Sequence, residues 1–268
     1  MIIREVTTKT CLGASKLCDY VINPYVGCQH ACKYCYAVFM KRFQNICEPW
    51  GSFVHIKSNS AEVLERELAR KPGGHVWISS VTDAYMPIER KVKLTRKILE
   101  TIVVSPHKEK FSFELLTKSS LVERDFDLLQ RLNCRLGCSL NTLNHNAARL
   151  IEPLASKPEA RITTLLKAKE HDIPVYGFIS PVIPDITDLA KLFAALQFTE
   201  YVWVELLNTT KSVLSRLLPV LKKDFPQAAR SLLDAMADPE RYYNNRVGEV
   251  KELSDKYHLK VEEVVRHQ

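Results

Sequence analysis

Asn23-Pro-Tyr-Val-Gly-Cys-Gln-His-Ala-Cys-Lys-Tyr-Cys-Tyr36 is the stretch of this chain that carries the most structural information. It places Cys28, Cys32 and Cys35 in a C-x3-C-x2-C pattern that directly follows Gly27. Thiolates at this spacing can converge on one metal centre if the backbone curls around it. Glycine adopts the positive φ angles that such a curl requires at no steric cost. The stretch therefore predicts a metal-binding loop.

Three interpretations of the loop are open at this point. The three cysteines could be ordinary buried apolar residues, although chance rarely produces this spacing. Zinc bound by Cys28, Cys32, Cys35 and His30 would be tetrahedral, but zinc sites usually consist of two separated pairs of ligands. An iron–sulfur cluster held by three thiolates is the interpretation that the spacing favours. Three ligands for a four-iron cluster would leave one iron open for chemistry.

The composition is that of a folded protein with reduced cysteines. The chain has 268 residues, of which 46% are hydrophobic, and 38 Lys and Arg against 31 Asp and Glu give a net charge of +7. These values exclude disorder and low complexity. No apolar run reaches about 18 residues, and residues 1–10 lack the apolar core of a secretory signal. We therefore expect a cytoplasmic protein without a membrane span, in which eight cysteines do not form a disulfide scaffold.

Strand-like and helix-like segments alternate along the first 210 residues. β-rich runs cover 20–23, 76–81, 113–117, 135–140, 175–179 and 201–207, and helical periodicity covers 61–70, 89–103, 121–132, 159–170 and 187–196. This alternation predicts an α/β fold, a partial (β/α)6 barrel with parallel strands and functional groups at their carboxyl ends. Helices predicted at 212–223, 226–237 and 239–257 would cap the barrel. We expect a barrel domain over 1–210 and a helical extension over 211–268.

The residues resemble the radical S-adenosylmethionine superfamily, and within it the spore photoproduct lyase-like (DNA repair photolyase-like) branch. The resemblance runs from about residue 20 to residue 185 and rests on motifs that occur in the same order. Besides the cysteine loop these are Thr82-Asp-Ala-Tyr-Met-Pro-Ile-Glu89, Leu94-Thr-Arg96, Thr117-Lys-Ser119, Arg124-Asp125, Glu152-Pro153 and Pro181-Val-Ile-Pro184.

The resemblance implies a [4Fe-4S] cluster and S-adenosylmethionine as cofactors. Cys28, Cys32 and Cys35 would each bind one iron, and S-adenosylmethionine would chelate the fourth. One electron, from a donor such as flavodoxin or ferredoxin, would cleave the sulfonium and give a 5′-deoxyadenosyl radical that abstracts hydrogen from the substrate. Cofactor-binding positions of the family match Tyr34, Thr82, Asp83, Lys118 and Ser139, and Tyr36 matches a tyrosine of the family's radical relay.

Several of these residues also have simpler interpretations. Lys118 could be a solvated lysine after a strand, and Asp83 could serve only a turn. Glu152 could be a surface charge at a helix end, and Arg161 could pair either with a carboxylate or with cofactor. Cys134 and Cys138 are expected to be small buried residues. Cys11, Cys18 and Cys47 form a poor pattern for a second cluster.

The substrate is the open part of the resemblance. Spore photoproduct lyases carry a hydrogen-donating cysteine on the second barrel strand, whereas the corresponding run here, 76–81, has none. The net charge and the basic run 90–97 permit a nucleic-acid substrate, although a solvated helix face is the simpler explanation of that run. The alternatives are lyase or modification chemistry on nucleic acid, radical modification of a peptide or small metabolite, and a non-enzymatic protein that binds a metal cluster.

Overall fold

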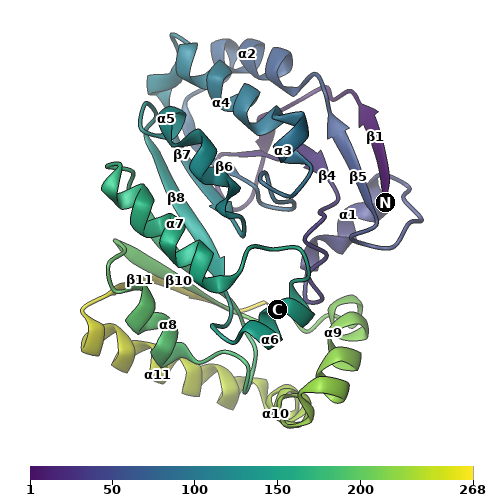
Figure 1. Cartoon of the computed structure of the whole chain (residues 1–268), viewed down its shortest axis with the longest axis vertical. Helices are drawn as coiled ribbons and strands as arrows, with labels where there is room; N and C mark the ends of the chain where they lie inside the picture. The colour runs from purple at the N-terminus through teal and green to yellow at the C-terminus, as the bar shows by residue number, and fades with distance from the viewer. Residues whose placement is uncertain (268) are drawn as a thin grey trace.

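The main sheet has eight strands in the computed structural model, which describes residues 1–267 (Figure 1). Its strand order is β11-β10-β9-β8-β7-β6-β3-β2, and every neighbouring pair is parallel except β2 with β3. The six predicted strands are β3 (Tyr20–Ile22), β6 (Gly74–Ile78), β7 (Phe111–Thr117), β8 (Cys134–Leu140), β9 (Val175–Val182) and β10 (Tyr201–Leu206). The prediction of a largely parallel α/β fold is therefore confirmed.

Helices that connect the parallel strands lie along the outer side of the curved sheet (Figure 1). Three of them were predicted almost to the residue: α2 (Ser60–Arg70), α7 (Pro158–Glu170) and α8 (Leu189–Leu196). Their apolar sides form one buried core with the sheet, to which Leu64, Leu165 and Phe193 belong. Burying a side chain of this size stabilises a fold by about 1.5–3 kcal/mol.

Two predicted helices differ from expectation. The segment 89–103 is divided into α3 (Glu89–Val92) and α4 (Leu94–Val104) because Lys93 takes a left-handed conformation, with φ of 54°. The buried Glu89 carboxylate accepts a hydrogen bond from the Thr95 backbone N–H at 3.1 Å, which caps α4. The segment 121–132 forms a 3-10 helix, η3 (Ser120–Asp125), followed by the short α5 (Phe126–Leu129).

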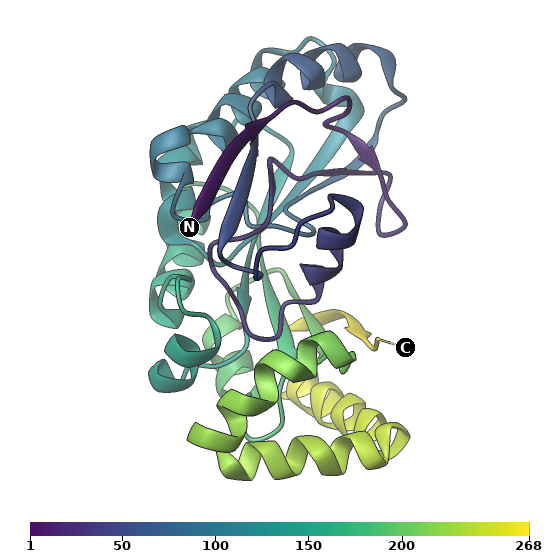
Figure 2. The ribbon, with the colours of Figure 1, turned by 90° about the vertical axis from the view of Figure 1, so that its right-hand side faces the viewer.

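A small second sheet, which periodicity did not predict, precedes and follows the cysteine loop. It consists of β1 (Ile2–Val6), β5 (Phe53–Lys57) and β4 (Tyr25–Val26), with β5 in the middle. Figure 2 shows β1 beside β5, near the N-terminus. The cysteine loop follows β4 directly and continues into a 3-10 turn, η1 (Tyr36–Phe39), and α1 (Met40–Phe43). One end of the loop is thus anchored in this sheet.

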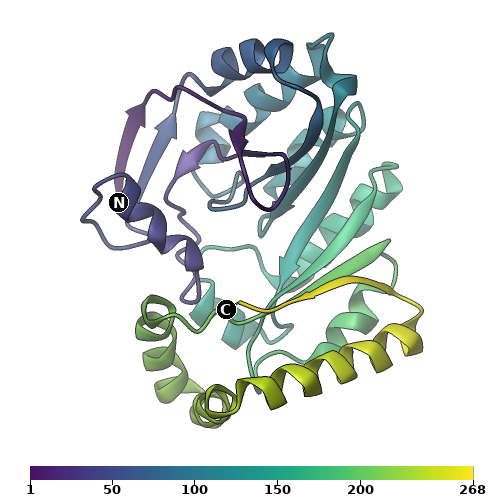
Figure 3. The same ribbon diagram turned by 180° about the vertical axis from the view of Figure 1, so that it is seen from behind.

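The C-terminal segment forms the three predicted helices and one strand that the sequence analysis missed. The helices are α9 (Lys211–Asp224), α10 (Pro226–Ala237) and α11 (Pro239–Tyr257). The prediction that the last 60 residues are helical is wrong at β11 (Lys260–Val265), which pairs in parallel with β10 at the sheet edge (Figure 3). The domain division at residue 210 stays a prediction.

Further short elements are η2 (Lys108–Lys110), α6 (His145–Ile151) and β2 (Gly13–Ala14). Within residues 1–267, none of the helices combines the length and the apolar character needed to cross a membrane.

Candidate functional site

A cavity of about 640 Å³ lies at the carboxyl ends of the parallel strands, beside the cysteine loop. Functional groups of parallel α/β folds gather at this end of the strands, and the volume is in the range of small-molecule sites. Among the residues that line the cavity are all nine that the sequence analysis singled out: Cys28, Cys32, Cys35, Tyr34, Tyr36, Thr82, Asp83, Lys118 and Ser139. Segments far apart in the chain therefore meet at one place.

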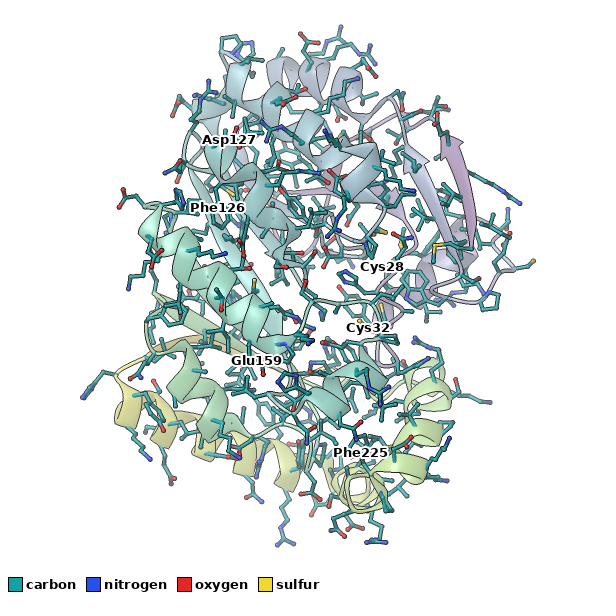
Figure 4. The ribbon with its side chains drawn as sticks, in the orientation of Figure 1. Cys28, Cys32, Phe126, Asp127, Glu159 and Phe225 are labelled. Carbon is teal, nitrogen blue, oxygen red and sulfur yellow. The ribbon has the colours of Figure 1, made fainter. Side chains whose placement is uncertain are left out.

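The cysteine loop curls as the glycine before it predicts. Gly27 has φ of 87°, and a Cβ atom at this position would lie 2.5 Å from the backbone oxygen of Phe53. The hydroxyl of Thr82 donates a hydrogen bond of 2.6 Å to the Gly27 carbonyl, so the strand end after β6 holds the start of the loop. Figure 4 shows Cys28 and Cys32 near the middle of the molecule.

Backbone hydrogen bonds also fix the other side of the loop. The N–H of Lys33 donates to the Ile151 carbonyl at 2.8 Å, at the end of α6. The N–H of Leu154 donates to the His30 carbonyl at 3.4 Å. The loop is therefore held between the small sheet, the end of β6 and the segment after α6.

The three loop thiols form no disulfide; Cys28 and Cys32 are buried, and Cys35 is half-buried. Burial raises the pKa of Cys32 to about 12 and also raises the pKa of Cys28 and of Cys35. A buried thiol of this kind is deprotonated when a metal binds its sulfur. Burial alone therefore keeps the thiols protonated, and metal coordination would supply the charge compensation.

The donor set fits a cluster better than a single ion. Over residues 1–267, no three His, Cys, Asp or Glu side chains come close enough together to hold one metal ion. A four-iron cluster does not need such convergence, because each thiolate would bind its own iron. The ring Nε2 of His30 is buried without a hydrogen-bond partner, so it is available to a polar group bound in the site.

Asp83 is buried and connects the end of β7 with the cysteine loop, so its role goes beyond forming a turn. Its carboxylate accepts hydrogen bonds from the Thr117 hydroxyl at 2.7 Å, the Lys118 N–H at 2.7 Å and the Tyr85 N–H at 2.8 Å. The His30 ring lies 3.3 Å away. Burial would raise the pKa of Asp83, but His30 and these donors outweigh it and hold the pKa well below its usual range.

Lys118 belongs to a second buried network rather than to the solvated surface. Its ammonium lies 5.7 Å from the centre of the Tyr34 ring. The Tyr34 hydroxyl donates to Glu152, which also forms an ion pair with Arg161. Burial favours the neutral Lys118, yet the Cys32 thiol and Glu152 outweigh that effect and raise its pKa.

The interpretation of Glu152 as a surface charge is wrong. Glu152 and Arg161 are both buried, at 2% and 1% exposure, so Arg161 pairs with a carboxylate. Arg161 also donates to the Ser139 carbonyl at 2.8 Å. The pair therefore supports both Tyr34 and Ser139 from behind the cavity wall.

Ser139 and Tyr36 complete the predicted set. The Ser139 hydroxyl donates to the Ser180 carbonyl at 3.3 Å, in the neighbouring strand β9. The Tyr36 hydroxyl donates to the Ser80 carbonyl at 2.5 Å, just beyond β6. Both side chains line the cavity.

An aromatic wall on the strands of the barrel escaped the sequence analysis. The rings of Trp77 and Phe178 are 6.2 Å apart, and those of Phe178 and Trp203 are 6.4 Å apart. All three line the cavity, as do the polar residues two positions later: Ser79 just after β6, Ser180 in β9 and Glu205 in β10. Alternate residues of a strand share a face, so this period of two is the signal that would have found them.

A carboxylate and an imidazole meet at the rim of the same cavity. The Nε2 atom of His267 lies 2.9 Å from a carboxylate oxygen of Glu205, which also accepts a hydrogen bond from the Ser180 hydroxyl. The hydrogen bond to Glu205 raises the pKa of His267. His267 follows β11, the strand that the sequence analysis did not predict.

The remaining five cysteines do not line the cavity in the described chain, 1–267. Cys134 and Cys138 are buried in β8, as expected for small core residues. Cys11 is buried, Cys18 is half-buried and Cys47 is exposed.

Comparison with known proteins gives a family and a fold. The family model described as "Radical SAM superfamily" matches residues 22–193. A protein of Methanocaldococcus jannaschii is 36% identical over 234 residues, which cover 87% of this chain and 86% of that protein. A protein of Acidianus two-tailed virus is 33% identical over 175 residues, covering 62% of this chain and 56% of that protein. Both relatives are described as uncharacterized.

Solved structures of spore photoproduct lyase variants share the fold. One variant has a TM-score of 0.69 at 17% identity, covering 98% of this chain and 82% of that chain. Another, solved with bound AdoMet and dinucleoside spore photoproduct, has a TM-score of 0.59 at 16% identity, covering 84% of this chain and 66% of that chain. At these identities the similarity concerns the fold alone.

Proposed function

This chain belongs to the radical SAM superfamily, and we propose that it is an enzyme that starts radical chemistry on a substrate held in the cavity beside Cys28, Cys32 and Cys35. The family implies a [4Fe-4S] cluster and S-adenosylmethionine as cofactors. The observation that carries the proposal is that the thiols of Cys28, Cys32 and Cys35, none of them in a disulfide, meet the other predicted site residues around one cavity.

When bound, the reduced cluster and S-adenosylmethionine supply a 5′-deoxyadenosyl radical that abstracts hydrogen from an unactivated C–H bond. The protein then has to bind, orient and shield the reactants. Cys28, Cys32 and Cys35 would hold the cluster. The Lys118 ammonium is suited to the carboxylate of S-adenosylmethionine, and Tyr34 offers an aromatic face beside it.

Thr82 and Asp83 support this site through the backbone. The Thr82 hydroxyl donates to the carbonyl of Gly27, which precedes Cys28, and the Asp83 carboxylate accepts from the N–H of Lys118, itself a proposed cofactor contact. The Asp83 carboxylate already accepts hydrogen bonds from protein donors, so in this proposal Asp83 is a positioning residue. Thr82 and Ser139 line the cavity, and in this proposal they contact the cofactor.

The substrate would occupy the part of the cavity between the aromatic wall and the cysteine loop. The rings of Trp77, Phe178 and Trp203 would keep water from a radical and pack against an apolar or planar part of the substrate. Tyr36 directly follows the third cysteine and lines the same cavity as the aromatic wall, which supports its proposed place in a radical relay.

Two substrate classes follow from different observations. The spore photoproduct lyase-like fold supports lyase or modification chemistry on nucleic acid. The carboxylates of Glu205 and Glu263 at the cavity favour a peptide or small metabolite instead, because they repel phosphate. In the basic run, Arg96 pairs with Asp125 and Asp127, which leaves less charge for phosphate.

The central test is production of 5′-deoxyadenosine after anaerobic reconstitution with iron and sulfide and reduction by dithionite. We expect Cys32→Ala to lose both the cluster absorption and cofactor cleavage. Cys138→Ala is the matched control, because it removes a buried thiol that lies outside the cavity lining, and it should retain both. Cleavage by Cys32→Ala at the parent rate would contradict the ligand assignment, and no cluster in the parent would contradict the enzyme proposal.

Salt-dependent binding separates the two substrate classes. A nucleic-acid enzyme should bind oligonucleotides at ~50 mM salt and lose affinity steeply as salt increases. Absence of binding under these conditions would favour the peptide or metabolite alternative.

A further inference from the structure

The carbonyl oxygens of two loop cysteines accept hydrogen bonds from Arg216, a residue of helix α9. Its Nη1 donates to the Cys32 carbonyl at 3.2 Å, and its Nη2 donates to the Cys35 carbonyl at 2.5 Å. Its Nε donates to the Ser212 carbonyl of its own helix at 3.0 Å. The guanidinium is therefore anchored to its own helix and binds two carbonyl groups of the loop at once, as its planar arrangement of donors allows. We call this pair of hydrogen bonds to Cys32 and Cys35 the grip of Arg216 on the loop.

Apolar packing joins the same two parts of the chain. Cys32 and Tyr34 share a buried cluster with Val213, Leu217 and Leu221 of α9. Helix α6 contributes Ala147 and Ile151 to this cluster. Helix α9 lies beyond residues 22–193, the part of the chain that the family model matches. The C-terminal helices thus build one side of the cysteine loop in addition to covering the barrel.

The position of the Arg216 charge matters for redox chemistry. One-electron reduction makes an iron–sulfur cluster more negative, and a nearby cation stabilises the more negative state. Net charge and hydrogen bonding around a cluster are established determinants of its reduction potential. Lys118 is a second cation beside the loop, so Arg216 would add to an existing positive environment.

We propose that Arg216 is a positioning residue for the cluster: it locks the cysteine loop onto α9 and raises the reduction potential of the bound cluster. The inference rests on the proposed function, because it assumes that the three cysteines hold a cluster. It adds that a helix outside the matched region controls how firmly the cluster is held and how readily it accepts an electron.

Two variants separate the grip from the charge. Arg216→Gln removes both, whereas Arg216→Lys keeps the charge and loses the two-point grip. Lys222→Gln is the matched control, because it removes one charge from an exposed position on the same helix. The measurements are the rate of iron release to a chelator from the reconstituted proteins and the midpoint potential from a dithionite titration followed by electron paramagnetic resonance.

We expect Arg216→Gln to release iron roughly 10-fold faster than the parent, because loss of a group that orients metal ligands typically lowers metal affinity by about 10–100-fold. Its midpoint potential should be lower than that of the parent. Arg216→Lys should also release iron faster, with a potential close to the parent value. Lys222→Gln should match the parent in both measurements.

If Arg216→Gln has the same rate of iron release and the same midpoint potential as Lys222→Gln, the proposal is overturned. If Arg216→Gln does not fold, Arg216→Lys decides: parent-like iron release would overturn the grip. Hydrogen exchange on the protein without iron gives a separate readout, in which the loop amides of 28–36 should exchange faster in either variant. Failure of the parent to form a cluster, with faster exchange in the variants, would contradict the enzyme proposal while the grip of Arg216 on the loop would stand.

Discussion

The hydroxyl of Tyr34 donates a hydrogen bond to the carboxylate of Glu152, which lies 118 residues later in the chain. Tyr34 is the residue before the third loop cysteine, and Glu152 follows α6. The carboxylate also pairs with the buried guanidinium of Arg161. One interior carboxylate therefore connects the cysteine loop to the segment between α6 and α7.

Removing this carboxylate should strongly destabilise the fold. Glu152→Leu would leave the charge of Arg161 buried without a partner, which typically costs about 3–5 kcal/mol. The free energy of unfolding in urea, measured on the protein without iron, tests this. Glu159→Gln is the control, because Glu159 pairs with His145 at the exposed surface, so this substitution should cost about 1 kcal/mol or less. A loss below about 1 kcal/mol for Glu152→Leu would contradict the role of the pair.

Gly27→Ala should destabilise the protein although it adds only a methyl group. The backbone is left-handed there, and the new Cβ would lie 2.5 Å from the Phe53 backbone oxygen, so we expect a loss of more than about 1 kcal/mol. Gly248→Ala is the matched control in α11, where the new Cβ would have no atom within 4 Å apart from its chain neighbours and the backbone of its own helix. It should stabilise by roughly 0.5–1 kcal/mol because alanine is a better helix former. Thermal unfolding of both variants checks the opposite signs.

Lys118→Met should weaken binding of S-adenosylmethionine and leave the cluster in place. A hydrogen bond to a charged group contributes about 1.5–3 kcal/mol, so we expect a roughly tenfold to hundredfold higher dissociation constant. Equilibrium dialysis with the reconstituted protein measures it. Lys222→Met, at an exposed position, should bind as the parent does. Parent-like affinity of Lys118→Met would remove Lys118 from the proposed cofactor site.

Acid should weaken the N-terminal segment through Glu67 in α2. Its carboxylate accepts hydrogen bonds from the backbone N–H groups of Cys11 and Leu12, both at 2.7 Å. Burial raises its pKa, but these donors, with the Thr10 hydroxyl and Lys71, outweigh burial and lower the pKa. Because the pKa is lower in the folded state, ionised Glu67 contributes its full share to the free energy of unfolding above the unfolded pKa of about 4.3. This contribution is lost as the pH falls below that value.

The comparison of the parent with Glu67→Gln tests this sign. The difference in their free energies of unfolding should be constant near neutral pH and should shrink as the pH falls from about 5 to about 3. A difference that stays constant or grows in this range would show that Glu67 does not act through its charge.

The pattern of residues within short segments was sufficient to predict the parallel strands and the cysteine loop. Runs such as 175–179 are buried on both faces of a parallel sheet, so they are apolar without alternation and easy to recognise. The loop was recognisable because three cysteines at this spacing rarely occur without a metal. These features are properties of short segments, which is why the chain alone predicts them.

Long-range side-chain contacts were beyond the reach of local pattern. Glu152 precedes a proline after a short helix and therefore resembles an exposed helix end, but Arg161 and Tyr34 bury it. Arg216 has the sequence context of an ordinary helix surface, and only the docking of α9 brings it to the loop. Strand β11 is short and half-exposed, so its pairing depends on the free edge of β10.

Hydrogen bonds at Gly27, at Lys33 and at the Cys35 carbonyl tie the cysteine loop to the rest of the fold. The conformational entropy of ordering the loop is therefore lost when the chain folds, in contrast with small zinc domains that fold only when metal binds. Assembly of a cluster here should be limited by delivery of iron and sulfide rather than by rearrangement of the polypeptide. The protein without iron should then have nearly the same circular dichroism and heat capacity of unfolding as the loaded protein.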